Sequence, residues 1–359
     1  MKISVYSPTI RRKEMDAVLS ALVEDRIGPG EQAKFLVQTA REKIKFDYCL
    51  ALRSPAMALH LALKSLGTEK GQGVLVSALS PFYYASVIED MGLVPVCCDV
   101  PASSACINRE TIEKAYSSRP DGLDTRCIVL HHTLGYLPDA EAIAELGIPV
   151  IEDCSQSYGA FMGNDKSGEE GPSINDSALN SNAGNIGIFS ILGLEERDML
   201  TSGGGALLYS KDRRGAAVLR GLGDLPPEYG LPDMNAAMAV VQFREAAKNL
   251  LKRREIARLY TQSALRTRHK SFIQQADAEY NNYAFPLILE TGVKEVKAYA
   301  RKKDIAVENA FDNTLIGTLK GDQYPEAYSL SLRTVLFPIY PRLGMADAGK
   351  VAKLILTLP

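Results

Sequence analysis

The 359-residue sequence has no excess of charge of either sign, because 41 basic and 43 acidic residues leave a net charge of -2. Proteins that bind nucleic acid or anionic membranes through their overall field need a marked positive balance. Neither nucleic acid nor a membrane is therefore predicted as a partner.

The chain also lacks long apolar runs. No run reaches the roughly 18 residues that a membrane-spanning helix needs. The first residues, MKISVYSPTIRRKE, have no apolar core of the kind found in secretory signals. We expect a cytoplasmic protein.

Paired cysteine motifs are missing as well. None of the six cysteines has the CxxC spacing of zinc sites and redox pairs, and several lie in apolar runs such as residues 94–98. The sequence predicts reduced core cysteines and no metal site.

What is present is a long alternation of short apolar runs and helical patterns. Strands are predicted at 48–52, 74–77, 94–98, 127–131 and 148–151. Helices are predicted at 11–25, 31–43, 56–66, from 83, at 109–116 and at 139–146. Such alternation is typical of an α/β fold with a mostly parallel sheet that is covered by helices on both faces.

The second half of the sequence has a different pattern. Residues 163–185 are rich in Gly, Ser and Asn and predict a long surface loop, and Gly203-Gly204-Gly205 precedes a strand-like run at 206–209. A long helix is predicted at 233–265, and its basic cluster at 252–254 is typical of a solvated face. A strand at 283–289 and helices at 293–302 and 346–356 follow. We place a domain boundary near residue 245, giving a large domain, 1–245, and a smaller C-terminal α+β domain, 246–359.

The run at 148–151 leads directly into Glu152 and Asp153. A buried parallel strand delivers its carboxyl end into the crevice where ligands of α/β proteins bind. Asp153 is therefore a candidate site acid, and the alternative is an acid that caps the turn at the end of the strand.

Seven short motifs in chain order together resemble one known family. They are ALHLAL at 58–63, SPF at 80–82, HTLG at 132–135, EDCSQSYGA at 152–160, GIFS at 187–190, RREIA at 253–257 and FPIYP at 337–341. The chain resembles the DegT/StrS family of pyridoxal-phosphate-dependent sugar aminotransferases over nearly its whole length. The resemblance implies the aspartate-aminotransferase type fold, that is, a type I PLP-transferase large domain.

The resemblance also implies roles for particular residues. Asp153 matches the acid that pairs with the pyridine nitrogen of PLP or PMP (pyridoxamine phosphate) and keeps that nitrogen protonated. Gln156 matches a residue that lies against the cofactor, and Tyr84 matches an aromatic that stacks on its ring, although a buried tyrosine is by default a core residue. Ser190 is assigned to the same site. The family further implies a homodimer and a nucleotide-sugar ligand.

The sequence departs from the family pattern where the Schiff-base lysine belongs. Residues 189–203, FSILGLEERDMLTSG, contain no lysine and no histidine. Counting forward from Ser190 puts Glu195 in the place of the lysine, with Glu196 if the register slips by one. Counting back from Gly203 leads closer to Asp198.

The predicted phosphate anchor is altered too. Where the family has Ser-Gly-Thr at a helix start, this chain has Ser54, Pro55 and Ala56. Proline has no N-H and alanine no hydroxyl, so two donors to a phosphate are lost. Asn185, Glu228 and Gly230 are further departures.

Three hypotheses remain open at this point. The chain is a degenerate family member that does not transaminate through a lysine Schiff base. Alternatively, it is an enzyme that holds PLP or PMP non-covalently on a sugar substrate, with Glu195 or Glu196 as general base. In the third hypothesis it is a sugar-binding or regulatory partner of an active paralogue.

Overall fold

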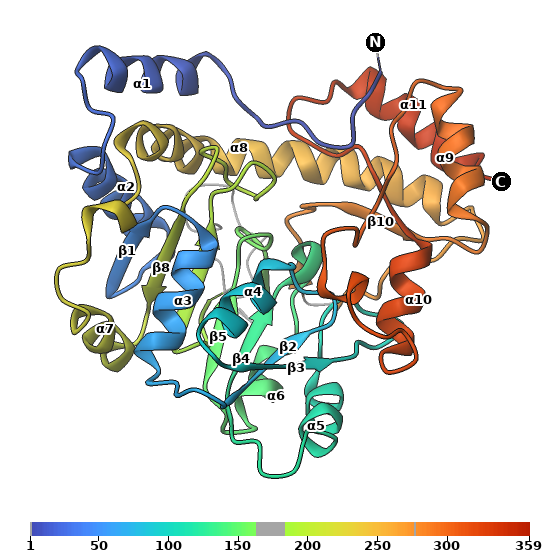
Figure 1. Ribbon diagram of the computed structural model, residues 1–359. Coiled ribbons are helices and arrows are strands. Elements are labelled where there is room, and N and C mark those ends of the chain that lie inside the picture. Colours follow the sequence, from blue (N-terminus) through green and yellow to red (C-terminus); the bar gives the residue numbers. More distant parts are fainter. Residues whose placement is uncertain (1, 163–183, 276–277) are drawn as a thin grey trace, which may run out of the picture.

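The computed structural model describes residues 2–162, 184–275 and 278–359. At its centre lies a seven-stranded sheet with the order β1-β8-β7-β5-β4-β2-β3 (Figure 1). Its strands are β1 (Tyr48–Leu52), β2 (Gly73–Ser77), β3 (Val94–Cys98), β4 (Thr125–His131), β5 (Val150–Asp153), β7 (Phe189–Gly193) and β8 (Ala206–Ser210).

The sheet is mostly parallel, as predicted. β3, β2, β4, β5 and β7 pair in parallel, and only β8 runs antiparallel to both of its neighbours, β7 and β1. The carboxyl ends of β1, β4, β5 and β7 therefore meet at one edge of the sheet.

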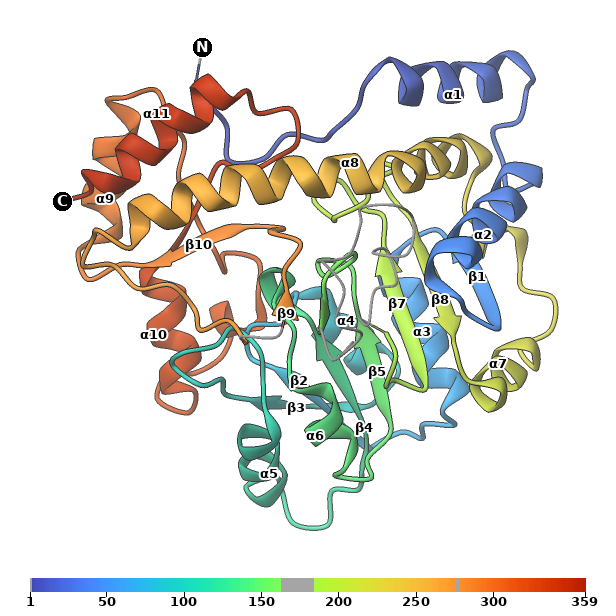
Figure 2. The same cartoon turned by 180° about the vertical axis from the view of Figure 1, so that it is seen from behind.

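Helices cover both faces of the sheet (Figures 1 and 2). Val76 and Ile151 pack with α3 (Pro55–Ser65) and α4 (Tyr83–Asp90) on one face, whereas Leu75 and Leu130 pack with α5 (Arg109–Ser117) and α6 (Ala140–Ala144) on the other. At the β8 end of that second face lie α2 (Glu31–Ile44) and α8 (Asp233–Ala264). The period-2 alternation of apolar residues along the buried strands thus gives each face of the sheet an apolar core.

The C-terminal part has its own small sheet. β10 (Phe285–Ile288), β12 (Thr334–Phe337) and β11 (Glu308–Asn309) are antiparallel, and α9 (Val293–Arg301), α11 (Met345–Leu356) and the second half of α8 pack against them. Ile3 joins this cluster and bridges to Ile305. The α+β character is as predicted, and the boundary at residue 245 remains a prediction, since α8 runs through it without a break.

The remaining elements are short or peripheral. They are α1 (Arg12–Val23), α7 (Arg213–Arg220), α10 (Pro325–Arg333), and the strands β6 (Phe161–Met162) and β9 (Ala278–Glu279), which pair with each other. The sequence patterns did not predict α7, α10, β11 or β12. Among the described residues no helix combines the length and the apolar character that crossing a bilayer requires.

Two expectations are corrected. The strand predicted at 148–151 is shifted to Val150–Asp153, because the ladder continues to pair Asp153 with His131 and Ile191 on its two sides. Arg253, expected on a solvated face, is 4% exposed, because its guanidinium points inward and donates to the buried carbonyl of Ile339. The loop predicted at 163–185 lies outside the described residues except for its last two positions.

Candidate functional site

Asp153 ends β5 and is 1% exposed. Its Oδ1 accepts hydrogen bonds from the backbone N-H of Ser155, at 3.0 Å, and from the Ser155 hydroxyl. Its Oδ2 accepts from the Tyr84 hydroxyl at 2.6 Å and from the Tyr83 hydroxyl at 3.2 Å. A carboxylate can accept about four hydrogen bonds. The four donors to Asp153 all come from this chain, and they therefore occupy its acceptor sites.

The two tyrosines stand in the first turn of α4. Tyr84 has no exposed surface, and its ring packs edge-on against His131, with 6.0 Å between the ring centroids. Burial and the charge of Asp153 raise the pKa of both tyrosine hydroxyls well above the ordinary value, so the hydroxyls stay protonated and donate. Burial lowers the pKa of His131 to about 4, which keeps that ring neutral.

A second acid, Asp198, lies near Asp153 in the loop between β7 and β8. Its Oδ2 accepts from the Glu195 backbone N-H at 2.8 Å. The same carboxylate comes so close to Gly193 that a Cβ there would lie 2.2 Å from Asp198 Oδ2 and 2.8 Å from Ser155 Oγ. Burial raises the pKa of Asp198 from 3.8 to about 8, and the charge of Asp153 adds to this effect. Both effects favour the protonated form of the Asp198 carboxyl near neutral pH.

Glu195 and Glu196, predicted in place of the lysine, have exposed side chains. The loop turns after Glu195, whose carbonyl accepts from the Asp198 N-H at 3.1 Å. This turn carries both glutamates outward and Asp198 inward. The position reached by counting back from Gly203 is thus the one that the fold brings to Asp153.

Both the side chain and the backbone carbonyl of Gln156 are hydrogen-bonded to neighbouring segments of the chain. Its Oε1 accepts from the Leu134 N-H at 2.7 Å, and Leu134 has a positive φ of 57°. Its own carbonyl accepts from Asn281 Nδ2 at 2.7 Å. The side chain therefore holds a strained turn at the end of β4, and the backbone carbonyl of Gln156 links this turn to the segment before β10.

Ser54 and Ala56 lie at the N-terminus of α3, at the same edge of the sheet. Ser54 is the N-cap residue, and its hydroxyl accepts from the Met57 N-H at 3.2 Å. Pro55 has no N-H to offer. In the first turn of α3, position 55 therefore has no N-H donor, and the N-H of Met57 is already bonded to the Ser54 hydroxyl.

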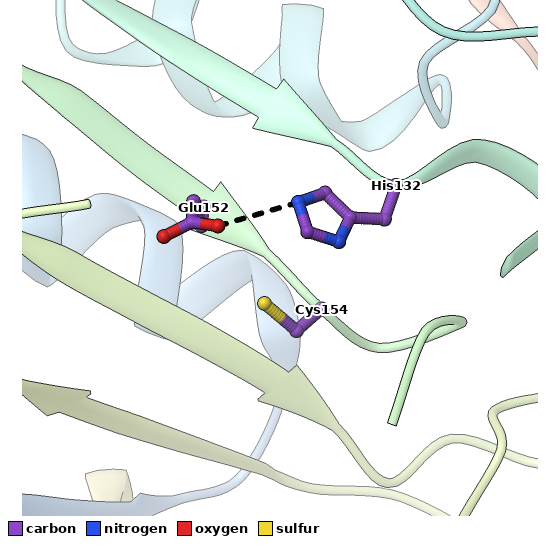
Figure 3. A group of neighbouring side chains, drawn as sticks. All are labelled: His132, Glu152 and Cys154. Atoms are coloured by element: carbon purple, nitrogen blue, oxygen red, sulfur yellow. Dashed lines mark ion pairs between the residues drawn. The ribbon is translucent and has the colours of Figure 1, made fainter. Parts of the chain in front are cut away.

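Ser190 lies on the other face of the sheet from Asp153. It pairs in register with Glu152, and its hydroxyl donates to the Gly184 carbonyl at 3.2 Å. Figure 3 shows Glu152 with His132 and Cys154 on this face; His132 Nε2 lies 3.4 Å from Glu152 Oε1. Ser190 and Asp153 are therefore not brought together.

The group His132, Glu152 and Cys154 has the side-chain types of a metal site, and its ligand atoms lie within 4.8 Å of one another. However, the Glu152 carboxylate already accepts from the backbone N-H groups of Ile186 at 2.8 Å and Gly187 at 2.6 Å. Burial opposes ionisation of Glu152, but these donors and His132 outweigh it and lower its pKa. Glu152 thus anchors the chain that enters β7.

Sequence reasoning missed several residues around Asp198. Burial, with a smaller contribution from Asp198, raises the pKa of both Tyr6 and Tyr283. Arg253 lies beside these tyrosines and donates through Nη1 to the carbonyls of Asn282, Tyr283 and Ile339 at 2.9–3.2 Å. No local pattern marks Tyr6 or Tyr283, whereas Ser155 lies within the motif at 152–160 and Tyr83 directly follows the motif at 80–82.

The sequence model of the DegT/DnrJ/EryC1/StrS aminotransferase family matches residues 8–356. The chain belongs to this family. The resemblance inferred from the seven motifs is thereby confirmed.

Individual curated relatives are about one-third identical to this chain or less, and only over part of its length. The chain is 30% identical over 189 residues to the L-glutamine:2-deoxy-scyllo-inosose aminotransferase of Streptomyces lividus, a match that covers 52% of this chain and 40% of the relative. The enzyme of the same name from Streptomyces fradiae is 30% identical over 169 residues, covering 46% and 35%. The matched part thus spans less than half the length of these curated relatives.

Solved structures show that the family fold extends over the whole chain. The putative sugar aminotransferase Spr1654 from Streptococcus pneumoniae, in its PMP form, superposes with a TM-score of 0.83 at 18% identity, covering 99% of this chain and 97% of that one. Its PLP form gives 0.84. Aminotransferase TlmJ from Streptoalloteichus hindustanus gives 0.81 at 20% identity, covering 99% and 98%.

Among the described residues, the arrangement at the strand ends does not fit a PLP group held as the resemblance implies. A pyridine nitrogen would have to displace a tyrosine hydroxyl to reach Asp153. The first turn of α3 offers few donors to a phosphate, and the segment between β7 and β8 has no lysine.

Proposed function

We propose that this chain is a sugar-aminotransferase family member that does not transaminate through a lysine Schiff base. The observation that carries the proposal is the Asp153 carboxylate, all of whose acceptor sites receive donors from Tyr83, Tyr84 and Ser155. Displacing a tyrosine would leave a buried phenol without its partner, which costs roughly 1–3 kcal/mol. The loss of the lysine and the altered turn at Ser54 support the same proposal.

The test is spectroscopic. Purified protein is mixed with one equivalent of PLP, reduced with borohydride and mapped by peptide mass spectrometry. A family member that has the lysine serves as positive control. We expect no Schiff-base absorbance band and no stoichiometric adduct, only scattered labelling of exposed lysines. A single lysine fixed at full occupancy, in any segment of the chain, would contradict the proposal.

A second candidate function is favoured by Asp198. A carboxyl that is protonated near neutral pH beside a hydrogen-bonded Asp153 is a pair of acids whose environments differ, which suits proton transfer. In this case Asp198, in place of Glu195 or Glu196, would move the proton for a non-covalently bound ligand. We propose nucleotide sugars and PMP as the ligand classes and the homodimer implied by the family as the assembly.

Calorimetric titration separates the two candidates. PMP and a panel of nucleotide sugars are titrated into the wild type, Asp198→Asn and the exposed control Glu196→Gln. Binding that Asp198→Asn alone weakens supports the second candidate. Heat from none of the ligands rejects it and leaves the first.

A further inference from the structure

A cavity of about 490 Å³ is lined by residues of both the large sheet's core and the C-terminal core. Tyr136 and Phe272 belong to the first of these cores, and Ala264 and Phe285 to the second. Ligand sites commonly lie where two parts of a protein meet, and their volumes run from roughly 300 to 1,000 Å³. The cavity therefore has the position and the size of a small-molecule site.

This cavity is distinct from the site at the strand ends. The described residues that line it include neither Asp153 nor Asp198. Asn282 lines the cavity, whereas the next residue, Tyr283, belongs to the group around Asp198. A ligand of the cavity is therefore a different molecule from one that is bound beside Asp153.

His269 provides a hydrogen-bond donor without an acceptor. Its side chain is 7% exposed, and the backbone N-H of Glu290 donates to Nδ1 at 3.2 Å. Because Nδ1 accepts, the neutral ring carries its proton on Nε2. Among the described residues Nε2 has no hydrogen-bond partner. A buried donor that lacks an acceptor is costly and therefore indicates a partner from outside the chain.

The backbone around His269 directs the ring toward the cavity. Lys270 and Ile288 of β10 exchange two backbone hydrogen bonds, at 2.9 and 2.8 Å, so the chain is extended at this point. Alternate side chains of an extended segment lie on the same face, and Thr267, His269 and Ser271 all line the cavity. An acceptor atom in the cavity is thus the partner that Nε2-H lacks.

The lining carries no formal charge. No Asp, Glu, Lys or Arg occurs among the described residues that form it. Burial, with a smaller contribution from Arg268, lowers the pKa of His269 despite the opposing charge of Glu290, which favours the neutral ring at neutral pH. A phosphate in this cavity would have no counter-charge, and its burial would be costly. The occupant is therefore an uncharged molecule.

The other lining groups are hydroxyls, amides and aromatic rings. Thr261 and Ser271 carry hydroxyl groups, and Gln274 carries an amide. Such groups can both donate and accept hydrogen bonds. The rings of Phe272 and Phe285 offer large apolar surfaces. This combination is complementary to a ring that has hydroxyl groups around its edge and C-H groups on its faces.

We propose that this cavity binds a neutral monosaccharide or cyclitol, one oxygen of which accepts a hydrogen bond from His269 Nε2-H. Thr261 and Ser271, which are exposed, lie at the entrance. Phe272 and Phe285, which are 3% and 8% exposed, lie at the base, where a face of the sugar ring packs on them. The proposal adds a second binding site to the one at the strand ends.

The first experiment observes the histidine rings by NMR of full-length protein labelled with 15N-histidine. The chain has four histidines, and the ring signals of His269 are those missing from His269→Asn. The probes are myo-inositol and D-glucose. We expect one or both to shift the His269 signals alone, in a saturable way, with a dissociation constant on the order of 1 mM, as is usual for ligands of this size.

Two further probes test the class of ligand. D-glucose 6-phosphate adds a charge to the sugar, and cyclohexanol keeps a six-membered ring but has a single hydroxyl. Both should bind at least about tenfold more weakly than the neutral polyhydroxylated probe, because the lining has neither a cation for the phosphate nor enough apolar surface to replace the hydrogen bonds.

The role of His269 is tested by two substitutions, with binding measured by saturation-transfer NMR of the probe. His269→Asn keeps an acceptor near the Glu290 N-H but removes the donor at Nε2. His269→Gln keeps a donor near the position of Nε2. We expect the first to weaken binding about tenfold and the second to stay within about threefold of the wild type.

A second pair of variants tests the entrance. Thr261→Trp narrows it from an exposed position on α8, and Gln262→Trp places the same side chain on the next residue, which is exposed and outside the lining. The response of the His269 signals to the probe should disappear in the first variant and persist in the second.

Three results would overturn the proposal. One is the absence of a saturable His269 response to both myo-inositol and D-glucose up to their solubility limits. Another is binding that His269→Asn or Thr261→Trp leaves unchanged, since the probe then lies elsewhere. The third is equal or tighter binding of D-glucose 6-phosphate or cyclohexanol. None of these results depends on whether the protein binds PLP.

Discussion

At the scale of single residues, Asp198 is the acidic residue that the fold places beside Asp153, where the family pattern leads one to expect a lysine. It is held by the Glu195 N-H and by the absence of a side chain at Gly193, and burial raises its pKa to about 8. A carboxyl that keeps its proton can donate as well as accept, which a carboxylate cannot. The chemistry of the site therefore differs from that of an amine at the same place.

This raised pKa predicts how stability depends on pH. Folded chain keeps the Asp198 proton up to about pH 8, whereas unfolded chain releases it near 3.8. Between these values the folded state binds more protons, so the free energy of unfolding falls as pH rises. We expect Asp198→Asn, which retains the acceptor oxygen, to remove this contribution. Urea denaturation between about pH 5 and about pH 8 measures it.

The control for this prediction is Glu196→Gln, two residues away and exposed. It should leave the pH dependence of the wild type unchanged. If Asp198→Asn and the wild type lose stability in parallel as pH rises, the raised pKa is wrong.

At the scale of elements, the connection between β7 and β8 decides which side chain enters the site. Gly193 ends β7, and its N-H donates to Ser155 Oγ at 2.7 Å. Leu194 continues the contact by donating to Gly205 at 2.8 Å. These hydrogen bonds close the base of the loop between β7 and β8, so the loop is compact.

Gly193→Ala tests this connection. The added Cβ would lie 2.2 Å from the Asp198 carboxylate, so Asp198 or the strand end must move. We expect a loss of about 1–3 kcal/mol in the free energy of unfolding, the usual cost of overpacking. The matched control is Gly349→Ala in α11, where nothing lies within 4 Å and a gain of about 0.5–1 kcal/mol is expected. Equal effects of both substitutions in urea denaturation would reject the close packing.

At the scale of the whole molecule, α8 joins the two parts of the chain. Its first half packs on the large sheet with α2, and its second half packs on the C-terminal sheet. Arg253 lies in the second half and ties the helix to the carbonyls of Asn282, Tyr283 and Ile339. One buried guanidinium thus fixes the helix, the segment before β10 and the segment after β12.

Arg253→Met is expected to destabilise the protein by at least about 3 kcal/mol, because one buried and two partly buried carbonyls lose their donor. Lys252→Met on the preceding residue removes only an exposed ion pair with Glu255 and should stay within about 0.5 kcal/mol. Thermal unfolding of both variants measures the difference. A small effect at Arg253 would mean that water replaces the guanidinium.

Much of the framework was predictable from sequence. The alternation of apolar runs and helical patterns located the strands β1 to β5 to within two residues and indicated the parallel sheet, because these signals are local. The short strands β11 and β12 were missed, since they are defined by pairing across the chain. Arg253 was placed on the wrong face because the helical pattern alone does not show where the buried carbonyls lie.

The sequence by itself determined the family, the parallel sheet and the acid at the end of β5, because motifs and hydrophobic periods are written in consecutive residues. Tertiary structure alone decided what surrounds that acid. Tyr83 and Asp198 lie 70 and 45 residues from Asp153 along the chain, and they meet beside it because β2, β5 and β7 end at one edge of the sheet. Likewise, the apolar spacing at 11–25 predicts the helix α1, but only the tertiary structure shows that its residues Met15, Leu19 and Leu22 are exposed to solvent.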